Sequence, residues 1–210
     1  MSLPPAELLA LYLPAMMLCI AVPGPDMLLA LSRGLGSCSL AALVSALGTG
    51  TGIACHSLLL GLGVSTLLHA SAWAFVVLKV AGAGYLIWIG LQSIRQRDLI
   101  GFGPAAEQPL RTVFITGWLS NLLNPKVAVF VIAFIPQFID HDAGPVATQI
   151  FALGGLFAVA TVFCYGALGA AAVPVGNLLK KRPGWVVRLN IGAGSMLVIS
   201  GLGLLALRQR

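Results

Sequence analysis

Two charged residues stand inside otherwise apolar stretches of this sequence, and each directly follows a proline. Asp26 ends the segment Pro23-Gly24-Pro25-Asp26, and Lys126 follows Asn124-Pro125 at a distance of 100 residues along the chain. Proline removes a backbone N–H donor and clashes with the preceding helical turn, so we expect a helix to break before each charge. The free N–H groups at the start of the next helix favour a negative charge at Asp26, or an anionic ligand in its place.

The composition places these charges in a membrane. The chain has 210 residues, of which 59% are hydrophobic and only 9% are charged, whereas about a quarter of a soluble domain is charged. Six apolar stretches approach the roughly 20 residues that cross a bilayer as a helix. They are continuous, unlike the alternating segments of a membrane β-barrel. The stretches are Leu8–Leu31, Leu40–Val64, Ala72–Leu91, Thr112–Phe138, Val146–Val175 and Val186–Leu207.

We therefore predict an all-α integral membrane protein with six transmembrane helices in a single domain over residues 1–210. The first stretch has no basic leader, so we interpret it as a span rather than a cleaved signal peptide. Lysine and arginine gather at the first, third and fifth connections between the stretches. These connections are expected to face the cytoplasm, because basic residues favour that side.

The second half of the chain resembles the first. Besides the two proline–charge pairs, the sequence Gly-Ala-Gly recurs at residues 82–84 and 192–194. We predict two repeats of three helices, at about residues 5–95 and 110–208, with the first helix of each broken at proline. Because three is an odd number, the repeats must be inverted in the membrane. Inverted repeats of this kind build transporters, whose site lies near the midplane at the repeat interface.

Lys126 is predicted to lie near the bilayer centre. It is 15 residues after Arg111 and 14 before Asp140, and a helix rises about 1.5 Å per residue. A charge at this depth costs about 2.5–3.5 kcal/mol on insertion scales. Asp26 is the only carboxylate in any predicted span, so we expect the two to face each other, directly or through water. The alternative is a buried ion pair that only fixes helix register.

Other polar or small residues on the predicted spans are weaker candidates. Gly48 and Gly52 are spaced for close helix approach, which is a packing feature or the lining of a substrate path. His56 shares their face and is either a hydrogen-bonded packing residue or a proton carrier. Tyr85 either presents its hydroxyl to the interior or packs. The predicted binding or coupling residues are Asp26, Lys126, Pro23, Gly24, Pro25, Asn121, Asn124, Pro125, Gly48, Gly52, His56 and Tyr85.

Four segments together resemble one protein family. VPGPDMLLALSRGLGSC, GTGTGIACHSLLLGLG, LKVAGAGYLIWIG and NLLNPKVAVFVIAFIPQF are similar to the LysE/RhtB family of amino-acid exporters. The similarity is greatest to the RhtB branch, whose members export homoserine, homoserine lactone, threonine or leucine. Pro23, Gly24, Pro25, Asn124, Pro125 and Lys126 match the motif positions. Ser37-Cys38-Ser39 departs from the basic residues that the family often has there.

The resemblance implies a secondary transporter of the bacterial inner membrane rather than an enzyme. It implies efflux by proton antiport with alternating access, no cofactor and no nucleic-acid partner; a homo-oligomer stays open. An amino acid is a zwitterion, so Asp26 and Lys126 offer a complement to each of its charges. The absence of a second intramembrane carboxylate favours small neutral amino acids. The alternative is a metal-ion or other small-solute exporter of the same architecture, although Asp26, Cys55 and His56 make a poor ligand set.

Overall fold

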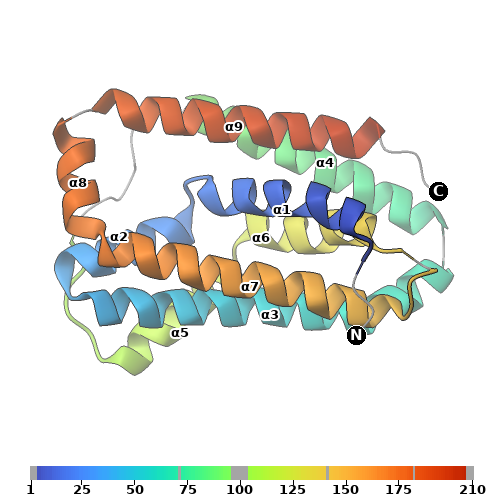
Figure 1. Cartoon of the computed structure of the whole chain (residues 1–210), viewed down its shortest axis with the longest axis horizontal. Helices are drawn as coiled ribbons and strands as arrows, with labels where there is room; N and C mark the ends of the chain where they lie inside the picture. Colours follow the sequence, from blue (N-terminus) through green and yellow to red (C-terminus); the bar gives the residue numbers. More distant parts are fainter. Residues whose placement is uncertain (1–3, 71, 96–103, 141, 182, 207–210) are drawn as a thin grey trace.

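The computed structural model describes residues 4–70, 72–95, 104–140, 142–181 and 183–206. Every regular element within these ranges is a helix (Figure 1). The prediction of an all-α protein is therefore confirmed for the described part of the chain.

Two bent helix pairs form where the sequence places its proline–charge segments. Helix α1 (Ala6–Ala21) is followed by α2 (Pro25–Gly36) at a bend of 56°. Helix α5 (Leu110–Leu122) is followed by α6 (Pro125–Val129), with a bend of 53° between α5 and the segment Pro125–Phe138. That segment continues from α6 through a π-helical turn, η1 (Phe130–Phe134), and a 3₁₀ turn, η2 (Ile135–Phe138). Proline occupies the first position of both α2 and α6, where its missing N–H is not needed.

The remaining helices are α3 (Ser39–Ala70), α4 (Ala72–Arg95), α7 (Val146–Ala170), α8 (Ala172–Lys181) and α9 (Pro183–Ala206). In the described residues, α3 and α7 are each long and apolar enough to cross a membrane, and the number of candidate spans reaches four if each bent pair is one span. The structure thus supports two to four of the six predicted spans, and the six-span architecture stays a prediction.

The fifth predicted span ends earlier than expected. We predicted a continuous helix to Val175, but α7 ends at Ala170 and a separate helix, α8, begins at Ala172. The cause is Pro174, which has no N–H to donate to the carbonyl of Ala170 four residues before it. The apolar composition continues through this proline, so hydropathy alone does not mark the break.

The helices pack as two pairs, with α1 and α6 between them and α5 against α3. Helices α4 and α9 lie side by side along one side of the molecule, and α3 and α7 along the other (Figure 1). Helix α1 contacts α7 and α9, while α6 contacts α3 and α4. Glycine allows the closest approaches; a Cβ at Gly90 of α4 would lie 2.6 Å from the carbonyl oxygen of Gly194 of α9. The side chains of Asp26 and Lys126 at the two breaks are consequently buried within the bundle.

Candidate functional site

The break after α1 leaves backbone carbonyls without their usual donors. In an unbroken helix the carbonyl of Cys19 would accept from residue 23, which is a proline. The ammonium group of Lys126 supplies the missing donor. Its Nζ donates to the carbonyl oxygen of Cys19 at 3.2 Å and to that of Val22 at 3.0 Å. The lysine thus caps the carboxyl end of α1, where the helix dipole favours a cation.

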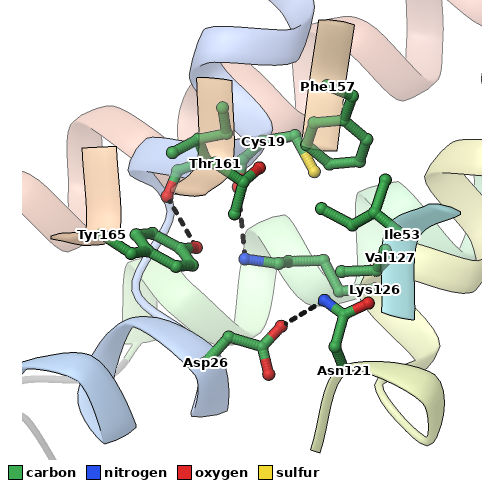
Figure 2. A pocket seen from close by; sticks show the side chains of 10 residues that line it. Cys19, Asp26, Ile53, Asn121, Lys126, Val127, Phe157, Thr161 and Tyr165 are labelled. Carbon is green, nitrogen blue, oxygen red and sulfur yellow. Dashed lines mark hydrogen bonds between the residues drawn. The ribbon is translucent and has the colours of Figure 1, made fainter. Parts of the chain in front are cut away.

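A second side chain completes this cap. The hydroxyl of Tyr165, on α7, donates to the carbonyl oxygen of Ile20 at 3.1 Å (Figure 2). Tyr165 is 4% exposed and Lys126 is 6% exposed. The end of α1 is therefore held by an ammonium from α6 and a phenol from α7, both shielded from the surroundings.

The carboxylate of Asp26 is held by the other break. Asp26 lies in the first turn of α2 and is 2% exposed. Its oxygens accept hydrogen bonds from Ser120 Oγ at 2.8 Å, Asn121 Nδ2 at 2.7 Å and Asn124 Nδ2 at 3.1 Å. All three donors are neutral and lie within five residues at the α5–α6 junction. A buried carboxylate requires such donors, because it has lost its water.

Each break therefore holds the charged side chain of the other. Asp26 and Lys126 line one cavity, yet no salt bridge joins them in the described part of the chain. The expectation that they face each other in one place agrees with this geometry, but its direct ion-paired form does not occur. Both ions already have short hydrogen bonds to neutral partners, which explains how they are accommodated separately.

The cavity between them is small. Its volume is about 10 Å³, which is roughly the space of one water molecule. Six helices contribute to its wall: α1, α2, α3, α5, α6 and α7. The lining residues are Cys19, Ile20, Asp26, Ile53, Asn121, Lys126, Val127, Phe157, Thr161 and Tyr165 (Figure 2). In this conformation the site is closed, and a larger solute requires the helices around it to separate.

Residues 17–208 of the chain match the family model of the LysE type translocator. The chain belongs to the LysE family. It is 34% identical over 197 residues to an uncharacterized membrane protein of Vibrio cholerae, covering 92% of this chain and 94% of that protein. It is 34% identical over 169 residues to the homoserine/homoserine lactone efflux protein of Salmonella typhimurium, covering 80% of this chain and 81% of that protein. No solved structure matches it.

A third relative is named for the efflux of a different substrate. The leucine efflux protein of Klebsiella pneumoniae is 31% identical over 158 residues, which cover 73% of each chain. These relatives confirm the resemblance to the LysE/RhtB family. The protein is accordingly a LysE-family translocator rather than an enzyme, and a multi-pass protein of the kind found in the bacterial inner membrane.

The motif residues of this LysE-family chain lie at the two breaks. Pro23 and Pro25 interrupt the first helix pair and Pro125 begins α6, while the Asn124 side chain accepts from the N–H of Lys126 at 3.0 Å. A Cβ at Gly24 would lie 3.1 Å from Lys126 Nζ. Glycine at this position therefore leaves space for the head of the lysine.

The predicted site residues on α3, which are Gly48, Gly52 and His56, pack against α5. A Cβ at Gly52 would lie 2.6 Å from Asn121 Oδ1, and His56 Nε2 lies 3.4 Å from the carbonyl oxygen of Asn121. Gly48 faces the backbone of α5 at Phe114. These three residues do not line the cavity. All three pack α3 against α5, and Gly52 and His56 also contact Asn121.

Tyr85 lies away from the cavity. It is half-buried on α4, and its ring packs at a tilt against that of Trp88 in the same helix, with 5.6 Å between the ring centroids. The structure does not bring it together with Asp26 or Lys126, and it is not among the lining residues. Packing of its ring against Trp88, about one turn further along α4, accounts for the position of Tyr85.

Sequence reasoning missed Ser120 and Thr161. Ser120 directly precedes Asn121, so the polar run before Asn124-Pro125-Lys126 was a usable signal. Thr161 lies four residues before Tyr165, and residues at this spacing share one face of a helix. That pair marks the polar face of α7, which the apolar sequence around it conceals.

Proposed function

We propose that this LysE-family protein exports small neutral amino acids or close derivatives from the cytoplasm. The observation that carries this proposal is the placement of one buried carboxylate and one buried ammonium on the same intramembrane cavity without a salt bridge between them. Relatives named for homoserine and leucine efflux support this substrate class.

The hydrogen bonds of the two ions suit exchange for a zwitterion. Lys126 now binds two neutral carbonyls, and Asp26 binds neutral hydroxyl and amide donors. A partner of opposite charge adds a Coulomb attraction that a hydrogen bond to a neutral group lacks. The carboxylate of an amino acid thus competes for Lys126, and its ammonium group competes for Asp26. A metal ion fits less well, because the ammonium of Lys126 would repel it.

The packing supports the predicted inverted repeats. If the repeats are related by a two-fold axis, α3 corresponds to α7, α4 to α9, and α1–α2 to α5–α6. The observed contacts are consistent with this exchange: α3 packs on α7, α4 packs on α9, and the pair α1–α2 contacts α7 as the pair α5–α6 contacts α3. The bends of 56° and 53° are also nearly equal. We infer alternating access by movement of the broken helices around a central site.

Proton antiport would employ Asp26. Protonation of this carboxylate removes its attraction for the ammonium group of the substrate, so a proton and an amino acid would bind alternately. The charged form is preferred when substrate is bound. This step gives a physical basis for coupling efflux to the proton gradient.

Transport by the purified protein in vesicles tests the proposal. Counterflow of radiolabelled homoserine and leucine is measured for the wild type, for the double variant Asp26→Leu/Lys126→Leu, and for the control Gly155→Ala. A Cβ at Gly155 meets no atom within 4 Å, so the control should transport normally. We expect the double variant to fold and to lose transport. Normal transport by it would show that the charges are structural, and no transport of any neutral amino acid by the wild type would refute the substrate class.

A further inference from the structure

Thr161 has an unused hydroxyl on the wall of the cavity. The residue is 2% exposed, and its Oγ1 is buried without a hydrogen-bond partner. Threonine and serine in helices usually donate to the carbonyl four residues earlier. Thr49, Thr116 and Ser57 do so, at 3.2, 2.8 and 2.9 Å. Thr161 differs from these three, and the difference occurs where the cavity lies.

A second unpartnered atom belongs to Asn121, another residue that lines the cavity. Its Nδ2 donates to Asp26, but its Oδ1 is buried without a partner. An amide oxygen only accepts hydrogen bonds, so it suits the ammonium group of a substrate already drawn to Asp26. Ser45 is also buried and unpartnered, but it does not line the cavity.

The groups around the cavity can then be divided among the parts of an amino acid. Lys126 suits the carboxylate, while Asp26 and Asn121 Oδ1 suit the ammonium group. Thr161 remains as a hydrogen-bond partner for the side chain of the substrate, and its hydroxyl can both donate and accept. Apart from Cys19 and Tyr165, whose hydroxyl already donates to Ile20, the rest of this wall is apolar and includes Ile53, Val127 and Phe157. A short aliphatic side chain with one terminal hydroxyl matches such a wall.

We propose that Thr161 is a specificity-determining residue, which binds a hydroxyl on the substrate side chain and makes the protein prefer hydroxylated neutral amino acids to aliphatic ones of equal size. This inference rests on the proposed function. An aliphatic substrate leaves the buried Thr161 hydroxyl unpaired, and sites of this kind reject the analogue that lacks the hydrogen-bonding group. The relatives named for homoserine and for leucine efflux differ in this substrate property.

Homoserine and norvaline test the inference, because they differ only by a hydroxyl in place of a methyl group. The two amino acids compete for transport in the same vesicles containing the full-length protein. Because both compounds are transported by the same protein molecules, the ratio of their transport rates does not depend on the amount of active protein. We expect the wild type to prefer homoserine about tenfold, which corresponds to one net hydrogen bond. Thr161→Val should reduce the preference to within about twofold, while Thr161→Ser should retain it.

Each outcome has a definite meaning. A wild type that transports both amino acids without preference, or that prefers norvaline, overturns the role of Thr161 and leaves the proposed function intact. An unchanged ratio in Thr161→Val also overturns it. If Thr161→Val does not fold, the wild-type ratio and Thr161→Ser still decide. A wild type that transports neither compound, with leucine and threonine also excluded, refutes the proposed function and this inference with it.

Discussion

Asn124 donates a hydrogen bond to Asp26 at 3.1 Å, although 98 residues separate them in the sequence. The same asparagine caps α6 by accepting from the N–H of Lys126. Asn124, the N-cap of α6 at the second break, therefore also binds Asp26, which lies in the first turn of α2 after the first break. Movement at either break must disturb the hydrogen bonds of both, which couples the two halves of the molecule.

Replacement of Lys126 by glutamine should abolish export. The shorter amide side chain has two N–H donors in place of three and does not reach as far into the α1 cap, and it carries no charge for a substrate carboxylate. Loss of a buried donor costs about 1–3 kcal/mol, so the midpoint of thermal unfolding in detergent should fall by several degrees. Transport in vesicles and thermal unfolding are measured on the same preparation. Full transport by Lys126→Gln would exclude the ammonium group from substrate binding.

Asp26→Asn should fold but lose about ten- to a hundredfold in transport. The side chain keeps its size and one acceptor oxygen, but it loses its attraction for an ammonium group, and charged hydrogen bonds are worth about 1.5–3 kcal/mol. Uptake driven by an imposed pH gradient is compared with counterflow at equal pH on both sides. Proton-driven transport at the wild-type rate would eliminate Asp26 as the proton carrier.

The sequence predicted the charged site better than the helices around it. Pro23, Pro25 and Pro125 predicted both breaks, because proline lacks a donor wherever it occurs. Of the two forms expected for the contact of Asp26 with Lys126, direct or through water, the direct ion pair does not occur, because the carbonyls freed at Cys19 and Val22 accept from the ammonium group. Such partners depend on backbone geometry.

The polar face of α7 was harder to predict for a different reason. Thr161 lies in a helix that is apolar nearly throughout, so neither its burial nor its missing partner is visible in composition. Tyr85 is the reverse case, because its ring packs against Trp88, and a tyrosine in a membrane helix packs as readily as it binds. Only the three-dimensional structure, which shows the neighbours of each side chain, distinguishes a residue that lines the cavity, such as Thr161, from one that packs, such as Tyr85.

Gly24→Ala should impair transport, whereas Gly155→Ala should not. The Cβ at position 24 would lie 3.1 Å from Lys126 Nζ, but at position 155 it would meet no atom within 4 Å. Gly24 has φ near −157°, which alanine adopts without strain, so the effect should come from the lysine alone. We expect a loss of several-fold in transport with little change in thermal unfolding. Equal transport by the two variants would show that the lysine head has room to move.

Tyr165→Phe should loosen the end of α1 without removing a charge. The phenol donates to the Ile20 carbonyl at 3.1 Å, and a lost buried hydrogen bond costs about 1–2 kcal/mol. Because the ring remains, the cavity wall is preserved, and Lys126 keeps its own bonds to Cys19 and Val22. Thermal unfolding should occur at a lower temperature, while the ratio of homoserine to norvaline transport stays unchanged. A shift in that ratio would instead show that Tyr165, rather than Thr161 alone, contacts the substrate side chain.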